Sequence, residues 1–320
     1  MPKAKPYMQL KPSEQIVAGI LKEYDLIHRA FKIFPHGIEN TSLFILTNKR
    51  KYVLRIYRKN RKTVKDIQQE LTFMEFLRDA NIPVPQVFKN KHGTYVTRYK
   101  TSTTLWSCIL QEFAQGSHPK KYSLKTIEKL AATQARMHVL GKEFAKRVPA
   151  QPYWVHLREK SFSPFIKISK LKSATIKDFV VRAKKCAYAL PKNLPIAYNH
   201  MDITHDNILV KNEAVTAVLD FDDACLAPTV ICLGYTLWDI IYITRKVQPI
   251  FSYLAAYTKH RPLTMLERRT LKDILLFRNY VIGTMEIMFY GEKGNDVKPI
   301  LKFEKMISEL NSELLVSRLT

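Results

Sequence analysis

Three oxygen-bearing side chains stand at the ends of short apolar runs in the middle of the chain. Asp202 follows the run 196–198, Asn207 stands five residues later, and Asp220 ends the run 217–219. Mg²⁺ prefers hard oxygen ligands and takes one or two carboxylates beside phosphates and water. An acceptor hydroxyl needs one further carboxylate that orients it and accepts its proton. The set therefore predicts a magnesium–nucleotide site beside a general base.

The elements that must position these side chains are short strands. The runs are rich in Ile and Val and too short for typical helices, and residues 211–213 form a hairpin-like turn. Protein kinases divide phosphoryl transfer among an Asp, an Asn five residues on, and a later Asp, and the spacings here agree. The alternative is a surface loop with ordinary Asx turns. Because both halves of the pattern occur together, phosphotransferase ancestry is the stronger interpretation.

The stretch 199–224 resembles the catalytic-loop and metal-binding motifs of the aminoglycoside phosphotransferase superfamily, the kinase-like small-molecule kinases that include choline kinases. The family pattern is H-x-D-x-x-x-x-N, a turn, and then I-D-F/W-x-x-A. This chain supplies His200, Asp202, Asn207, Asp220, Phe221 and Ala224. A weaker resemblance extends from about residue 13 to residue 290. It implies an α+β, bilobal protein-kinase-like fold, with a small antiparallel β-sheet N-lobe bearing one helix and a larger, mainly helical C-lobe.

The resemblance also implies roles for the residues of the motif. Asp202 would orient the acceptor hydroxyl and take its proton, and His200 would brace the catalytic loop through hydrogen bonds. Asn207 and Asp220 would hold Mg²⁺, and ATP would be the phosphoryl donor. Residues 1–99 are then expected to form the nucleotide-binding lobe, and residues 100–320 the catalytic and substrate lobe.

A cation and a carboxylate of the small lobe match the family's phosphate-binding pair. Arg55 lies in the predicted strand 52–57, and Glu70 lies beside the apolar stripe of the predicted helix 63–80. The resemblance implies that Arg55 binds the nucleotide phosphates and that Glu70 positions it. Arg is a planar, bidentate phosphate binder, so the role is chemically sound. Glu75 is the competing carboxylate on the same helix.

Two further segments are expected to touch the nucleotide. Gly37 and Asn40 match the loop that covers the phosphates with backbone N–H groups. Main-chain groups near Arg98 and Tyr99 would meet the adenine, because the polar segment 100–104 resembles a hinge between the lobes. Because these contacts would be made by the backbone, they leave no signature in the amino-acid sequence.

One position of the large lobe departs from the family pattern. The family usually places an Asp near the start of the helix predicted at 228–244, where this chain has Cys232. A thiol is a weaker acceptor than a carboxylate, so the bracing of the catalytic loop is an open question. Asp222 or Asp223 could substitute, and the sequence does not decide between them.

Other polar residues of the predicted helices are ambiguous. His138 matches a family histidine and is expected to be a buried structural residue. Tyr235, Asp239, Arg278 and Glu286 interrupt apolar stretches, where each is either a pocket residue or a satisfied core group.

The composition bounds the partners. Lys and Arg total 52 against 28 acidic residues, a formal net charge of +24, which favours anionic partners such as nucleotides. No long basic run is interleaved with aromatic residues, which argues against nucleic-acid binding. The most apolar segment, 229–244, is too short to span a membrane.

The four cysteines form no CxxC pair, and no histidine stands beside them at metal-ligand spacing, so no zinc site is expected. Free thiols and the lack of a signal-peptide core near Met1 indicate a cytoplasmic protein.

The acceptor is expected to be a small molecule with a hydroxyl group, such as an amino alcohol, a sugar or a homoserine-like compound. A net charge of +24 disfavours polycationic aminoglycosides. One alternative is a pseudokinase or nucleotide-binding scaffold with an anionic partner, which Cys232 favours. Another is a protein kinase, but no activation segment is recognisable between Asp220 and Pro228. The acceptor, the choice of ATP or GTP, and the oligomeric state are not specified by the sequence.

Overall fold

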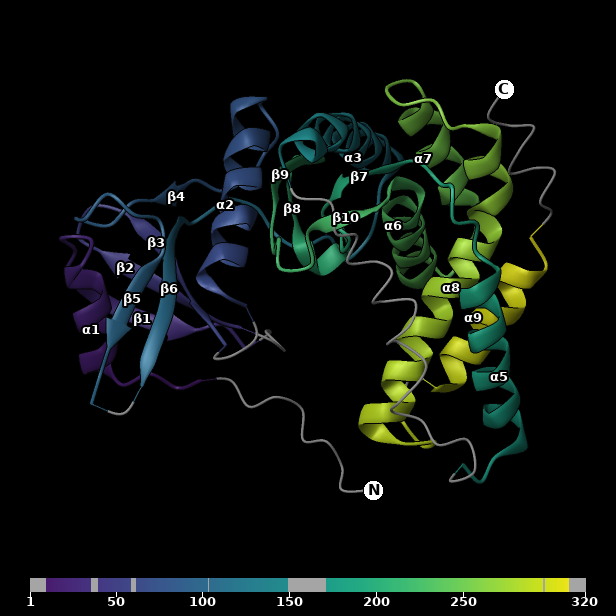
Figure 1. The fold of residues 1–320 in the computed structure, drawn as a ribbon, viewed down its shortest axis with the longest axis horizontal. Coiled ribbons are helices and arrows are strands. Elements are labelled where there is room, and N and C mark those ends of the chain that lie inside the picture. Colours follow the sequence, from purple (N-terminus) through teal and green to yellow (C-terminus); the bar gives the residue numbers. More distant parts are fainter. Residues whose placement is uncertain are drawn as a thin grey trace. The chain divides into compact units, whose positions relative to one another are not determined.

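The computed structural model describes residues 10–35, 40–58, 62–102, 104–148, 171–295 and 297–310. Within these ranges the chain forms two compact units that divide between Gln115 and Gly116 (Figure 1). The first unit is built around a sheet and the second is mainly helical, as the α+β prediction requires.

A six-stranded antiparallel sheet dominates the first unit. The strand order is β1-β2-β3-β6-β4, and β5 pairs with β6 beside β4. Its strands are β1 (His28–Ile33), β2 (Thr41–Thr47), β3 (Lys51–Tyr57), β4 (Val87–Phe88), β5 (Thr97–Lys100) and β6 (Leu105–Glu112).

The hinge predicted at residues 100–104 is wrong, because its described residues connect two paired strands of one sheet. The Thr101 N–H donates to the Thr104 carbonyl oxygen over 2.8 Å, and β5 pairs with β6 from Thr97↔Cys108 to Lys100↔Leu105. A polar, threonine-rich composition is typical both of linkers and of turns, so it does not distinguish the two. The sheet has six strands, and the two units divide after Gln115, later in the chain than the boundary expected after Tyr99.

Two helices accompany this sheet, α1 (Glu14–Lys22) and α2 (Val64–Asp79). Ser13 caps α1, and Thr63 forms a capping box with Asp66 at the start of α2. α1 packs its apolar face onto β2 and β3 to form the core of the unit. The buried face of α2 contains one carboxylate among apolar side chains: Ile67, Glu70, Leu71, Phe73, Met74 and Leu77.

The second unit is a helical assembly around α6 (Thr229–Thr244), which is buried from Thr229 to Ile241, as the prediction of a core helix requires. Gly234 permits its close approach to α8, because a Cβ atom there would collide with Ile274. No helix in the described ranges is long and apolar enough to cross a membrane. The other helices are α3 (Leu124–Phe144), η1 (Ala145–Arg147), α5 (Ala174–Ala189), α7 (Gln248–Thr258), α8 (Met265–Tyr290) and α9 (Val297–Ser308).

His138 on α3 is the buried core residue that the sequence predicts. Its side chain is 2% exposed, and its Nδ1 atom lies 2.7 Å from the Tyr257 hydroxyl of α7. Burial is the main cause that lowers the pKa of His138 well below its usual range, so the imidazole is neutral.

Two small antiparallel sheets carry the motif residues at their ends. β7 (Ile196–Asn199) pairs with β10 (Cys225–Pro228), and β8 (Ile208–Lys211) forms a hairpin with β9 (Ala214–Val218). The hairpin turns at Asn212 and Glu213, which have φ values of 51° and 61°. Two positive φ values are what a tight primed turn requires. The short 3₁₀ helix η3 (His205–Asn207) precedes β8.

Candidate active site

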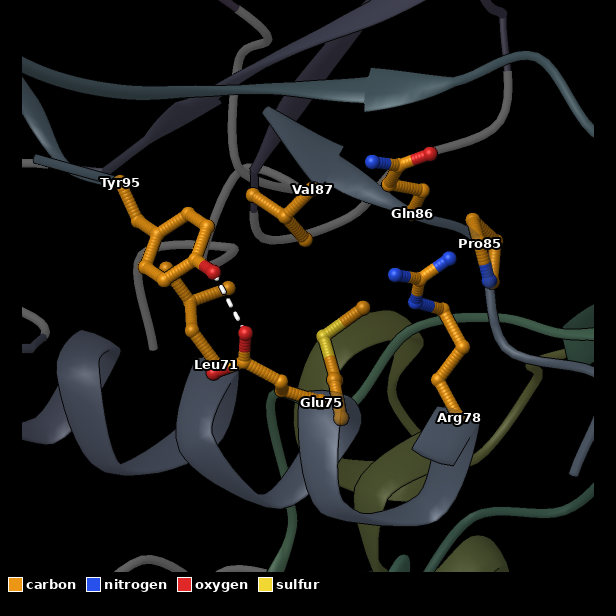
Figure 2. Close-up of a pocket in the computed structure, with 8 residues that line it drawn as sticks. Leu71, Glu75, Arg78, Pro85, Gln86, Val87 and Tyr95 are labelled. Carbon is orange, nitrogen blue, oxygen red and sulfur yellow. Dashed lines mark hydrogen bonds between the residues drawn. The ribbon is translucent and has the colours of Figure 1, made fainter. Parts of the chain in front are cut away.

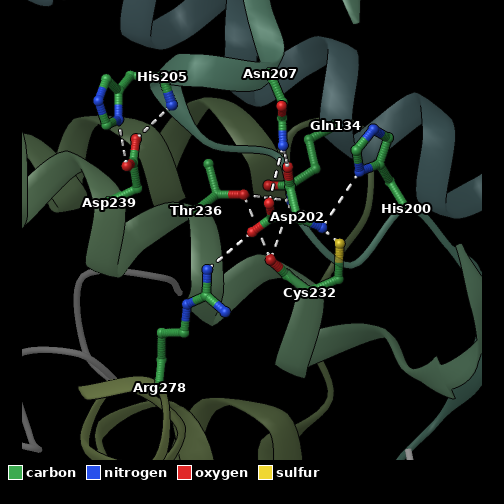
Figure 3. A network of polar contacts seen from close by, with 9 residues as sticks. All are labelled: Gln134, His200, Asp202, His205, Asn207, Cys232, Thr236, Asp239 and Arg278. Carbon is green, nitrogen blue, oxygen red and sulfur yellow. Dashed lines mark hydrogen bonds and ion pairs between the residues drawn. The ribbon is translucent and has the colours of Figure 1, made fainter. Parts of the chain in front are cut away.

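The loop between β7 and β8 brings together two of the predicted functional residues. The Asn207 side-chain amide donates to both the Asp202 carboxylate Oδ2 and the Asp202 backbone oxygen, each over 2.9 Å (Figure 3). Arg278 of α8 donates from Nη2 to the other carboxylate oxygen, Oδ1, over 2.8 Å. The Asp202 side chain is still 29% exposed, so a ligand can reach it.

The electrostatic surroundings of Asp202 have opposing effects on its pKa. Burial raises the pKa of the carboxyl above its ordinary value, and the Arg278 cation acts in the opposite direction without cancelling the effect of burial. A carboxylate with a raised pKa is a better proton acceptor, provided that it remains ionised at the working pH.

His200 connects this loop to the segment that contains Asp220. Its Nε2 atom lies 2.8 Å from the Leu219 carbonyl oxygen, and its Nδ1 accepts from the Asp202 backbone N–H over 3.2 Å. A carbonyl needs a donor and an N–H needs an acceptor, so the ring is the neutral Nε2–H tautomer. The ring is 1% exposed, and burial lowers its pKa, which favours the same neutral form.

Asp220 lies directly after the residue that His200 contacts. The Leu219 N–H donates to the Asn207 carbonyl oxygen over 2.8 Å, which ties the two expected metal ligands together through the main chain. Asp220 has a left-handed φ of 60°, and its carboxylate lies at the surface of the unit. An Asp tolerates this conformation better than most residues, which suits a position where the chain must turn sharply.

Two residues of α6 support the loop, and sequence reasoning did not assign this role to either. Asp239, 3% exposed, accepts from the His205 backbone N–H over 2.8 Å and lies 2.7 Å from His205 Nδ1. Burial alone would lower the pKa of His205, but its hydrogen bond and charge interaction with Asp239 raise it. The backbone N–H of Met201 donates to Cys232, whose thiol pKa burial raises to about 12.

The sulfur at position 232 therefore occupies the place where a carboxylate was expected, and it contacts the loop as a neutral thiol. Gln134 donates to this sulfur over 3.7 Å and to Thr236 over 2.8 Å, and it accepts from the Tyr253 hydroxyl over 2.6 Å. Buried polar networks of this kind fix a structure when each member has a partner.

In the first unit, Glu70 is buried to 2% exposure and has a cationic partner that the sequence did not predict. Lys62 donates to Glu70 Oε2 over 2.7 Å, and the Tyr57 hydroxyl donates to Oε1 over 3.0 Å. Arg55 of β3 is 7% exposed, and its Cζ lies 5.6 Å from the centre of the Tyr57 ring. Lys62 lies eight residues before Glu70 in the chain, and nothing in its immediate neighbours marks it as a partner of that carboxylate.

The competing carboxylate, Glu75, has different surroundings from Glu70. It is exposed, and its Oε1 accepts from the Tyr95 hydroxyl over 2.6 Å (Figure 2). Both residues line a small pocket between α2 and the β4 region, together with Leu71, Met74, Arg78, Pro85, Gln86 and Val87. Burial among apolar side chains thus distinguishes Glu70 from Glu75.

The remaining predicted nucleotide contacts are placed as follows. Asn40 accepts from the Arg58 backbone N–H over 2.9 Å, and Gly37 lies outside the described residues. Arg98 is exposed on β5, and Tyr99 packs so closely on α1 that a Cβ atom on Gly19 would collide with its hydroxyl. The argument for Arg98 and Tyr99 depended on a hinge where the chain instead connects two paired strands, and their contact with a nucleotide stays a prediction.

Comparisons with known proteins show what the chain is similar to. Homoserine kinase of Bradyrhizobium sp. (strain BTAi1) is 26% identical over 263 residues, which cover 78% of this chain and 77% of that protein. The microcompartment-associated aminopropanol kinase has a TM-score of 0.73 at 18% identity and covers 96% of this chain and 99% of its own. Amicoumacin kinase hAmiN, solved with AMP-PNP, Ca²⁺ and Ami, has a TM-score of 0.74 at 16% identity, with 95% and 97% covered.

The structural likeness confirms the expected kinase-like fold. A sequence model of the phosphotransferase enzyme family matches residues 30–269, a range that includes both Arg55 and Asp220. The chain therefore belongs to the phosphotransferase enzyme family and is a kinase that acts on an alcohol group of its acceptor.

Proposed function

We propose that the protein transfers the γ-phosphoryl group of ATP, in the presence of Mg²⁺, to a hydroxyl of a small metabolite, with Asp202 as the base. One observation carries the proposal. The Asp202 carboxylate is fixed from one side by Asn207 and from the other by Arg278, yet its side chain is 29% exposed. A carboxylate fixed by two donors and open to ligand can orient a hydroxyl and accept its proton.

Asn207 and Asp220 are the residues that would hold Mg²⁺. The Asn207 amide nitrogen donates to Asp202, so its amide oxygen is the atom left for a metal. Within the described ranges no group of three or more His, Cys, Asp or Glu could hold a metal by itself. A two-residue site fits Mg²⁺, which takes its other ligands from phosphates and water and neutralises the charge on the phosphate oxygens.

Arg55 and Lys62 are the cations that would bind the nucleotide phosphates, and Glu70 would hold them in place. Gly37, Asn40, Arg98 and Tyr99 remain proposed nucleotide contacts of the backbone type. The solved complex of amicoumacin kinase hAmiN with AMP-PNP and Ca²⁺ supports the use of a nucleotide with a divalent cation.

The acceptor class follows from the relatives, whose names are homoserine kinase and aminopropanol kinase. Both names describe small compounds with an amino group and a hydroxyl group, so we propose an acceptor of this size. We place the reaction in the cytoplasm, because all four cysteines are free thiols.

The test is a coupled ADP-release assay with ATP and Mg²⁺ against a panel of hydroxylated metabolites, with thermal stability followed in parallel. We expect turnover with at least one small alcohol and an ATP-induced rise in melting temperature that EDTA removes. Asp220→Asn should lose the metal-dependent part of that rise. Asp206→Asn, on the exposed face of the same loop, should keep it. A rise that is identical with EDTA would contradict the metal assignment, and no ADP release with any acceptor would contradict the activity.

A further inference from the structure

A guanidinium group lies fixed beside the proposed base. Arg278 of α8 donates from Nη2 to Asp202 Oδ1 over 2.8 Å (Figure 3). The Arg278 Cζ also lies 4.2 Å from the centre of the Tyr235 ring. The Arg278 side chain is only 13% exposed. Stacking on an aromatic face restricts the plane of a guanidinium, so the orientation of its donors is set in advance.

Most donors of this guanidinium are unused. A guanidinium has five N–H groups, and within the described residues the structure gives Arg278 one hydrogen bond, to Asp202. Its Nε atom is buried and has no hydrogen-bond partner there. Nη1 also has no hydrogen bond within the described residues and is not among the fully buried atoms, so its N–H groups are the donors that a ligand oxygen can reach.

We propose that Arg278 selects acceptors that carry a carboxylate a few carbon atoms from the hydroxyl that is phosphorylated. This inference rests on the proposed function, because it assigns the reacting hydroxyl to Asp202. A planar carboxylate matches the geometry of a guanidinium edge, which makes short hydroxy acids and hydroxy amino acids the fitting class.

The spacing limits the length of the acceptor. The Arg278 Nη2 and Asp202 Oδ1 atoms are 2.8 Å apart. The hydroxyl of the acceptor would form one further hydrogen bond with Asp202, and its carboxylate would form another with Arg278. The two acceptor groups are then separated by on the order of 5 Å, because hydrogen bonds of this kind measure about 2.8 Å and meet at an angle. A chain of about three or four carbon atoms spans that distance.

Charge also separates acceptors. Arg278 lies between the Asp202 carboxylate and the proposed carboxylate of the acceptor, so it offsets the repulsion between the two anions. An acceptor that places only an ammonium group near Arg278 meets a like charge and leaves the unused donors without an oxygen. Selection against the wrong acceptor then comes from repulsion as well as from a missing contact.

The reaction step is unchanged for this acceptor class. The hydroxyl oxygen forms a bond to the γ-phosphorus and its proton passes to Asp202. The bond between the γ-phosphorus and the bridging oxygen breaks, and ADP leaves with the electron pair. Arg278 contacts the acceptor but neither gains nor loses a proton.

A matched set of probes tests the inference. L-Homoserine and 3-amino-1-propanol differ only by the carboxylate, and 4-hydroxybutyrate keeps the carboxylate without the amino group. We expect wild-type kcat/KM to favour the two carboxylates over the amino alcohol by about tenfold to a hundredfold. Arg278→Met should remove that preference mainly through KM, and Arg278→Lys should keep part of it. Arg269→Met, at an exposed position of the same helix, should resemble wild type.

Binding of the probes without ATP separates this inference from the proposed function. Wild-type protein should bind L-homoserine and 4-hydroxybutyrate in calorimetric titrations, and Arg278→Met should bind them at least about tenfold more weakly. Binding of this kind without turnover would contradict the proposed activity and support Arg278 as a carboxylate site. Failure of the wild type to bind either carboxylate, or equal loss of all three probes in Arg278→Met, would overturn the inference.

Discussion

Two cation–carboxylate pairs, one taken from each unit, differ in exposure more than in length. Lys62 lies 2.7 Å from Glu70 in the first unit, and Arg278 lies 2.8 Å from Asp202 in the second. The Glu70 side chain is 3% exposed, whereas that of Asp202 is 29% exposed. Similar contacts therefore serve different purposes, according to whether a ligand can reach the carboxylate.

The partners of the two carboxylates support this distinction. Lys62 and Tyr57 occupy one oxygen each of Glu70, so this carboxylate organises the side chains around it. Asn207 and Arg278 likewise hold the two oxygens of Asp202, but an open face remains for a hydroxyl. Glu70 should accordingly be important for stability and nucleotide affinity, and Asp202 for turnover.

The largest expected effect concerns the Arg278–Asp202 pair, whose carboxylate is the more exposed of the two. Asp202→Asn should lower kcat by about a thousandfold, because an amide cannot accept the hydroxyl proton and general-base catalysis is typically worth 10²- to 10⁴-fold. ATP affinity should change little. Turnover is measured by ADP release, and affinity by thermal shift with ATP and Mg²⁺.

Asp206→Asn is the matched control, since it makes the same change on the same loop at a side chain that is 78% exposed. A kcat for Asp202→Asn within threefold of wild type would remove Asp202 from the mechanism.

The next effect concerns the buried Lys62–Glu70 pair, called the closed pair below. Glu70→Gln should destabilise the protein by about 2 kcal/mol, because Lys62 keeps its charge at 15% exposure while the carboxylate 2.7 Å away loses its own. Urea unfolding measures the loss, and the KM for ATP should rise while kcat falls less than in Asp202→Asn. Glu75→Gln, at an exposed carboxylate of the same helix, is the control. Equal urea midpoints for wild type and Glu70→Gln would show that the pair contributes nothing.

Acid titration sharpens the contrast between the units, because the second unit contains the buried neutral His138. The folded pKa of this residue is lowered, so below a pH of about 6.5 the unfolded chain binds a proton that the folded chain does not. Stability should therefore fall as the pH drops below that value, by up to about 1.4 kcal/mol per pH unit for one histidine.

The measurement is urea unfolding at several pH values. His138→Gln should flatten the profile and the exposed His260→Gln should not. An unchanged slope in His138→Gln would exclude His138 as the source.

The smallest effect removes one hydrogen bond from the closed pair. Tyr57→Phe keeps the Lys62–Glu70 contact and should cost about 1 kcal/mol of stability, because it deletes one donor to a charged group. Urea unfolding gives the loss, and kcat should remain at the wild-type value. A large fall in kcat would show that the closed pair also takes part in turnover.

The local part of the site was predictable from the sequence, because backbone geometry over a few residues fixes it. His200, Asp202 and Asn207 lie within one loop, and their mutual hydrogen bonds follow from that spacing. Arg278 is 76 residues from Asp202, and nothing in its neighbourhood specifies that partner. The same reasoning explains why Lys62 was not identified as a partner of Glu70, although it is only eight residues away.

The fold was predicted where periodicity was strong and missed where one composition suits two structures. The buried stripe of α2 and the apolar run of α6 appear where expected. The sequence did not predict a turn near residues 100–104, because polar residues of this kind also suit a linker. The following strand, β6, was for the same reason not predicted.

Cys232 was the feature that most favoured a scaffold without activity. In the structure its sulfur accepts from the Met201 N–H, and Asp239 on the same helix supplies the acidic support of the loop at His205. The departure from the family pattern thus leaves the loop braced at both ends.

Because Cys232 and Asp239 stand two turns apart on α6, this one helix holds both ends of the catalytic loop. Between them, Gly234 packs on Ile274, one turn before Arg278 on α8. A methyl group at position 234 would push these helices apart and change the gap between guanidinium and carboxylate. Under the proposed mechanism, Gly234 would thus influence the alignment of the reacting groups from inside the helical core.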